Sequence, residues 1–166
     1  MITFLNGTLT DALPTQAVID VNGIGYEVLI PLSSFEKLPG LGQAVTLKTQ
    51  LVVREDSQTL YGFATDDERD LFKLIQSVSG IGPRLALNVL SGMSVVTFKG
   101  AIGACDVKLL SSINGVGKKT AERMVLELKD KVGVAVGAAT ALGQATAPRD
   151  KTIADAAAAL EALGTK

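Results

Sequence analysis

The chain has 166 residues, of which 47% are hydrophobic and 20% charged, so it can hold one compact domain or two small ones. It has no histidine, and Cys105 is its only cysteine, which excludes an internal disulfide, a His/Cys zinc cluster and any catalytic triad that uses histidine. No apolar run approaches the ~20 residues of a membrane span and the start does not resemble a signal peptide, so we expect a cytoplasmic protein with Cys105 in its core.

The net charge of −1 conceals an uneven distribution of charged side chains. Residues 1–64 hold three basic and six acidic side chains, a net of −3, whereas residues 65–133 hold ten basic and eight acidic ones, a net of +2. We therefore expect an anionic partner to bind the middle of the chain.

Residues 1–64 show the alternation and turns of short β-strands. Strands over 17–21 and 24–30 flank an Asn22-Gly23 turn, and apolar residues alternate over 45–53 before the chain turns at 55–57 and returns over 59–63. About five strands fit this segment. They predict a small β-barrel, for which the five-stranded OB type is the natural candidate, although strand count alone does not separate it from other small barrels.

From Thr65 onward the spacing of apolar residues is that of α-helices. Residues 65–68 form a capping box, with Glu68 as its acidic member. Short helical patterns continue to Lys131, interrupted by glycines, and Pro83 suits the first position of a helix. Residues 65–132 are therefore predicted to form a compact helical domain.

The last part of the chain changes composition again. Residues 133–148 carry no charge and consist mainly of Gly, Ala, Thr and Val, so we predict a flexible linker over 133–150. Residues 151–166 predict one amphipathic helix, which cannot bury its apolar stripe alone and needs a partner.

The helical domain contains an internal repeat. The sequence SVSGIGPR at 77–84 returns 35 residues later as SINGVGKK at 112–119, and each copy joins a helix end to a helix start through a Gly-apolar-Gly turn. The glycines permit positive φ and leave the amides bare, and amides at a helix N-terminus bind phosphate. Four basic side chains extend each turn into a patch for consecutive phosphates: Arg84, Lys118 and Lys119 beside the turns, and Arg123 one helical turn after Lys119 on the exposed side.

Other interpretations of these motifs are weaker. One Gly-apolar-Gly turn alone is more simply a tight corner between helices, but two copies with the same context favour phosphate binding without base readout. The sequence around Lys118 is not a Walker A loop, since Lys119 stands where Ser or Thr is required. We therefore expect no nucleotide, cofactor or metal site.

Two further classes of protein stay open at this point. A repair enzyme could carry such turns as its DNA-binding module, but no carboxylates are paired at a spacing that suggests a metal site. A single-strand binder could use the barrel, but its aromatic residues share faces with core residues.

Three motifs in order make the chain similar to the RuvA family: VREDSQTLYGF at 53–63, GIGPRLA at 80–86 and GVGKKTAER at 115–123. The resemblance covers residues 1 to about 132. It implies an OB-type barrel over 1–64, tandem helix-hairpin-helix motifs over 65–132, and a non-catalytic homotetramer that holds an open Holliday junction. The implied partners are the RuvB ATPase motor and the RuvC resolvase.

The resemblance also implies roles for particular residues. Gly80, Gly82, Gly115 and Gly117 would present amides to phosphates, supported by the four basic side chains beside the turns. Glu55 and Asp56 match the family's acidic pin, which would repel misplaced DNA at the junction centre, and Arg54 would offset part of that repulsion.

The chain departs from the family pattern at its end. Family members continue through a third domain of three helices that docks on the motor, whereas 151–166 hold only the first of them. We therefore expect junction binding to persist and motor docking to be incomplete.

Overall fold

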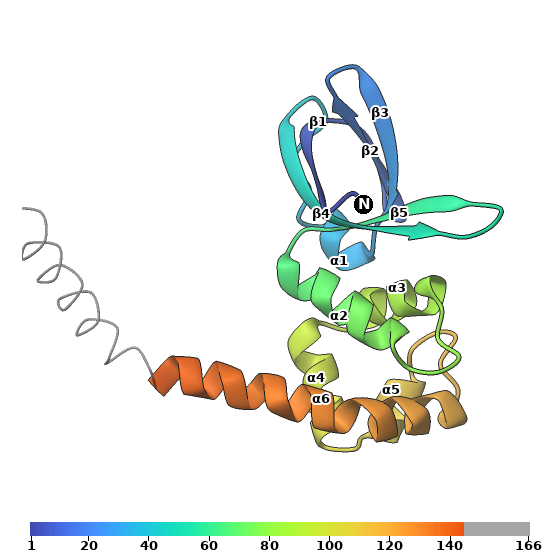
Figure 1. Cartoon of the computed structure of the whole chain (residues 1–166), viewed down its shortest axis with the longest axis vertical. Coiled ribbons are helices and arrows are strands. Elements are labelled where there is room, and N and C mark those ends of the chain that lie inside the picture. Colours follow the sequence, from blue (N-terminus) through green and yellow to red (C-terminus); the bar gives the residue numbers. More distant parts are fainter. Residues whose placement is uncertain (145–166) are drawn as a thin grey trace, which may run out of the picture. The chain divides into compact units, whose positions relative to one another are not determined.

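The computed structural model describes the backbone of residues 1–144 and the side chains of residues 1–132 (Figure 1). The chain divides into two compact units, Met1–Lys129 and Asp130–Lys166. The first unit contains both the predicted barrel and the glycine turns. The domain boundaries at 64, 132 and 150 stay a prediction.

Five strands form a closed barrel in the order β1-β2-β3-β5-β4. Four pairs are antiparallel and β3 pairs with β5 in parallel, with the short helix α1 between β3 and β4. This confirms the predicted five-stranded, OB-type barrel. The elements are β1 (Phe4–Leu13), β2 (Gln16–Val21), β3 (Ile24–Leu29), α1 (Leu32–Phe35), β4 (Ala44–Val53) and β5 (Gln58–Phe63).

Turn chemistry and alternation explain the barrel. Asn22 and Gly23 both have positive φ, 53° and 89°, as a two-residue hairpin turn requires. Along β4, Val45 and Leu47 are buried in the barrel core, but Val53 is 61% exposed. The β4–β5 hairpin therefore continues beyond the barrel and projects from it (Figure 1).

The predicted helical domain is confirmed as a set of short helices after β5. They are α2 (Asp66–Gln76), α3 (Pro83–Gly92), α4 (Val95–Gly103), α5 (Val107–Ser111) and α6 (Lys118–Gln144). Within the described residues no single helix is long and apolar enough to cross a membrane; α3 and α4, bent by 99°, meet the length and composition criterion only as a pair.

The capping box at Thr65 is only half formed. The Thr65 side chain accepts from the amide of Glu68 at 3.3 Å, as predicted, but the Glu68 carboxylate does not return to the helix start. It is buried and accepts hydrogen bonds from Ser34 Oγ at 2.7 Å and Lys37 Nζ at 3.1 Å. Ser34 Oγ also accepts from the Ala64 amide, so this cluster joins the barrel to α2.

Replacing Glu68 by Gln should lower the free energy of unfolding by about 1.5 kcal/mol, because a buried charge-assisted hydrogen bond is lost. Burial alone would raise the pKa of Glu68, but the hydrogen bonds from Ser34 and Lys37 outweigh it and hold the pKa below its ordinary value. A depressed folded pKa stabilises the chain above about pH 4.3, and this contribution disappears as the pH falls further. Urea unfolding at pH 7 and pH 3 measures both effects; a Glu68→Gln variant as stable as the wild type at pH 7 would contradict the prediction.

Cys105 is exposed, so its predicted place in the core is wrong. It follows α4 with φ +56°, its amide donates to Ile102 O, and the Asp106 amide donates to Ala101 O at 2.9 Å. These bonds form a Schellman motif, in which Cys105 occupies the left-handed position that glycine usually fills.

Replacing Cys105 by Gly should raise the free energy of unfolding by about 1 kcal/mol, since glycine adopts positive φ without steric cost. The side chain is exposed, so its removal sacrifices little packing. The matched control is Cys105→Ala, which keeps the Cβ and should leave the urea midpoint unchanged. Equal midpoints for the Gly and Ala variants would show that the backbone is not strained.

The helix α6 continues through residues 133–144, where the sequence predicted the start of a flexible linker. The segment is rich in alanine, which has the highest intrinsic helix propensity, and this favours extension of a helix that has already begun. Residues 145–150 of that linker and the amphipathic helix predicted over 151–166 lie outside the described residues.

Candidate nucleic-acid interface

The two glycine turns have the same backbone hydrogen bonds. In the first turn, between α2 and α3, the Ile81 amide donates to Val78 O at 3.1 Å. In the second, between α5 and α6, the Val116 amide donates to Ile113 O at 3.0 Å. The repeat in the sequence is therefore also a repeat in structure.

The apolar residue in the middle of each turn is buried. Ile81 is 7% exposed and Val116 is 5% exposed. Both side chains anchor their turns in the helical core, so the turn backbones face outward as the motif predicts.

The two glycines of a turn have different roles, which the sequence did not distinguish. Gly80 and Gly115 have φ of +82° and +86°, but Gly82 has φ −94°, and Gly117 is also outside the positive region. Of the two properties that the sequence assigned to both glycines, positive φ is used only by the first of each pair, and the missing side chain is the property that distinguishes the second. A Cβ added to Gly82 or Gly117 would meet nothing within 4 Å, so these positions lie open to an approaching ligand.

The helix starts that follow the turns are suited to an anion. No side chain caps α3, and neither α3 nor α6 has an acidic residue in its first turn. The first amides of a helix have no intrahelical partner and carry the positive end of its dipole. By contrast, α2 begins with three acidic residues and a Thr65 cap, so its own side chains satisfy its start.

Lys118 and Lys119 occupy the first turn of α6 and are both exposed. Cations at this end of a helix oppose its dipole and destabilise the folded chain. A bound phosphate would reverse that effect, because it is attracted by the lysines and by the helix end together.

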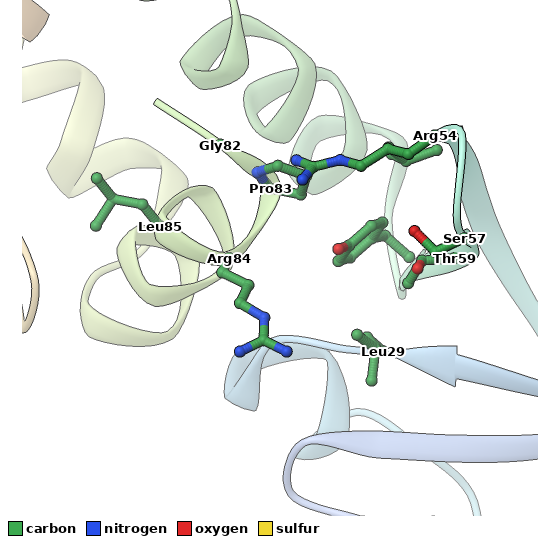
Figure 2. A pocket seen from close by; sticks show the side chains of 10 residues that line it. Leu29, Arg54, Ser57, Thr59, Gly82, Pro83, Arg84 and Leu85 are labelled. Carbon is green, nitrogen blue, oxygen red and sulfur yellow. The ribbon is translucent and has the colours of Figure 1, made fainter. Parts of the chain in front are cut away.

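Arg54 and Arg84 line one cleft of about 510 Å³ between the β4–β5 hairpin and the first turn. Figure 2 shows Arg54 reaching from the hairpin toward Gly82 and Pro83, with Arg84 on the α3 side. The structure thus brings three of the predicted site residues together: Arg54, Gly82 and Arg84. No residue of the second turn lines this cleft.

Arg123 is exposed on α6 one helical turn after Lys119, as the sequence predicted, but its hydrogen-bond partner was not foreseen. Its Nη1 donates to the carbonyl of Ser79 in the first turn at 3.1 Å. Glu127, one helical turn later on α6, accepts from the Ser79 amide at 3.0 Å. Sequence reasoning missed Ser79 and Glu127, since only folding brings them together.

Glu55 and Asp56 form the exposed tip of the β4–β5 hairpin, where the Arg54 amide donates to Ser57 O at 2.8 Å. The turn predicted at 55–57 is therefore confirmed. Neither carboxylate has a hydrogen bond or ion pair within the described part of the chain. Their charges face solvent at the end of a projecting hairpin.

Two aromatic side chains of the barrel, Tyr61 and Phe63, are buried against α2, whereas Phe4 on β1 is 58% exposed. Tyr61 and Phe63 lie 5.0 Å and 4.8 Å, by ring centroids, from Phe72 of α2. Tyr61 and Phe63 are therefore not available to stack on bases, which leaves the barrel without the paired aromatic platform that the single-strand interpretation would need from these two residues. Among the residues that the structure describes, no three His, Cys, Asp or Glu side chains gather as a metal site would require.

An OB-type barrel joined to tandem helix-hairpin-helix motifs defines a class of nucleic-acid-binding protein, and comparison with known proteins narrows it. Residues 1–62 match the family model described as the RuvA N terminal domain, and residues 72–130 match a SAM-like helix-hairpin-helix tandem. The Holliday junction branch migration complex subunit RuvA of Opitutus terrae is 49% identical over 99% of this chain and 84% of its own length. The protein of the same name from Albidiferax ferrireducens is 48% identical over 98% of this chain and 90% of its own length. That from Stenotrophomonas maltophilia is 48% identical over 100% of this chain and 84% of its own length. The chain belongs to the RuvA family.

Proposed function

We propose that this chain holds four-way DNA junctions by their phosphate backbones without reading base sequence. The observation that carries the proposal is the pair of matching turns, each of which opens a helix start that has no acidic residue in its first turn and lies beside exposed basic side chains. Each such site contacts consecutive phosphates, and phosphate contacts position a duplex without touching base edges.

The relatives support the kind of DNA and the kind of complex. They are named as subunits of a Holliday junction branch migration complex, and we propose the same substrate and complex for this chain. The family resemblance adds a homotetramer that holds four arms, with RuvB as the ATPase motor and RuvC as the resolvase. The chain itself binds and places DNA, and its partners carry out the chemistry.

A gel-shift competition tests the proposal directly. The full chain is offered a synthetic four-way junction against linear duplex and single strand of equal length. We expect the junction to compete best, and the affinity to fall steeply with salt because phosphate contacts release counterions. Equal affinity for junction and duplex would reduce the function to that of a general helix-hairpin-helix DNA-binding module, as in a repair enzyme; preference for single strand would overturn it.

Neutralising the hairpin tip with Glu55→Gln and Asp56→Asn should leave the junction affinity equal or increase it by about threefold, because carboxylates repel the backbone. The same variant should slow branch movement driven by the motor, since the tip places strands rather than binding them. Junction affinity and branch migration rate are the two measurements.

The matched control for the hairpin tip is Glu27→Gln with Glu36→Gln, two exposed carboxylates outside the hairpin. It removes the same charge and should leave branch movement unchanged. Clearly weaker junction binding by the tip variant would contradict repulsion as the role of Glu55 and Asp56.

A further inference from the structure

Two side chains of α6 hold the backbone of the first turn at one residue. Arg123 Nη1 donates to the carbonyl of Ser79 at 3.1 Å, and Glu127 Oε2 accepts from the amide of Ser79 at 3.0 Å. Arg123 also lies against Gly80, since a Cβ there would be 3.0 Å from its Nη1. The helix α6, which begins at the second turn, is therefore hydrogen-bonded to the first turn through one cationic side chain, Arg123, and one anionic side chain, Glu127.

The corresponding contact from α3 to the second turn lacks such hydrogen bonds within the described residues. The 35-residue repeat aligns Asn88 with Arg123 and Gly92 with Glu127. Leu85 and Asn88 lie 3.2 Å and 3.5 Å from the place of a Cβ on Gly115, which is packing contact only. In the described residues no α3 side chain is hydrogen-bonded to the second turn.

We infer that Arg123 and Glu127 are positioning residues, which fix the first turn at a set distance from the second so that both phosphate sites engage one DNA duplex together. This rests on the proposed function and deepens it. Two linked sites bind more tightly when their spacing is fixed in advance, because binding then costs less conformational freedom. Arg123 thus acts through Ser79 and the turn that follows it.

Because Glu127 is negatively charged, the direction of the change in DNA affinity on its replacement tests the inference. A carboxylate beside a phosphate site repels DNA, so electrostatics alone requires that Glu127→Ala binds more tightly. Positioning requires the opposite: Glu127→Ala removes the hydrogen bond to Ser79 and should bind junction and duplex roughly fivefold more weakly. Glu127→Gln removes the charge but keeps an oxygen acceptor, so it should bind at least as well as the wild type.

Glu122→Ala is the matched control, because Glu122 is exposed on the same helix, nearer its start, and within the described residues its side chain is hydrogen-bonded to neither turn. It removes the same charge and should bind equally or up to about twofold more tightly. Tighter binding by both Glu127→Ala and Glu122→Ala would overturn the positioning role.

Hydrogen exchange at the Ser79 amide provides a readout without DNA. Exchange of this amide in the free protein, measured by NMR, should be slow in the wild type and in Glu127→Gln and fast in Glu127→Ala. Unchanged exchange of the Ser79 amide in Glu127→Ala would overturn the inference. This result does not depend on DNA binding, because the free protein is measured. Failure of the wild type to bind any DNA would instead refute the proposed function, so the two failures are distinct.

Discussion

Replacing Lys118 and Lys119 together by Ala should weaken binding to four-way junctions by about 2.5 kcal/mol, roughly sixtyfold, since we propose that each lysine makes a charge-assisted contact to phosphate. Both side chains are exposed in the first turn of α6, where they oppose the helix dipole. The variant should therefore unfold at the same or slightly higher denaturant concentration than the wild type. Loss of binding without loss of stability separates a role in binding from a role in the fold.

The salt dependence gives the same prediction a second measurement. Removing one cation from a phosphate lowers the slope of log affinity against log salt by about one unit, so the slope of the double variant should be lower by about two. Duplexes of unrelated sequence should be affected alike. The control is Lys48→Ala on β4, whose charge is already paired with Asp66 at 3.8 Å and which lies outside both turns. An effect confined to one DNA sequence would contradict backbone recognition.

The barrel could be predicted because its signals are local. Alternation along β4 and the Asn22-Gly23 turn depend on neighbours in sequence, and both reappear in the structure. Alternation did not show where the barrel ends, since Val53 keeps the pattern while its strand has already left the core. Burial depends on what lies across the sheet, which the period of a strand does not encode.

In the candidate site, too, local features could be predicted and tertiary contacts could not. The repeated turns and their basic neighbours followed from spacing, but the partners of Glu68 and Arg123 did not. Ser34 lies 34 residues from Glu68 and Ser79 lies 44 from Arg123, so only the tertiary fold brings these pairs together. The 35-residue register aligns Asn88 with Arg123, and in the structure each of the two lies against the glycine of the other turn.

Glycine content alone did not reveal which glycines serve the fold and which serve the ligand. Gly80 and Gly115 are required by backbone conformation, since their φ values are positive. Gly82 and Gly117 have neither positive φ nor a neighbour in the way of a side chain. Both residues directly precede a helix start, where glycine is favoured over alanine, and a phosphate bound as proposed would add a second reason for the missing side chain.

Replacing Gly82 and Gly117 together by Ala should weaken junction binding by about 2 kcal/mol, roughly thirtyfold, because two methyl groups would hold phosphates away from the helix amides. The free energy of unfolding should change by less than about 1 kcal/mol, since the Cβ atoms enter open space. Junction titrations and urea unfolding of the same preparation measure both quantities.

Gly100→Ala with Gly103→Ala in α4 is the matched control for the turn glycines, because a Cβ at either position also meets nothing within 4 Å and neither has positive φ. Its affinity for junctions should equal that of the wild type. Normal binding by the Gly82 and Gly117 variant would mean that the amides do not touch phosphate. The lysines and arginines would then bind DNA as side chains alone, and the glycine turns would be no more than tight corners between helices.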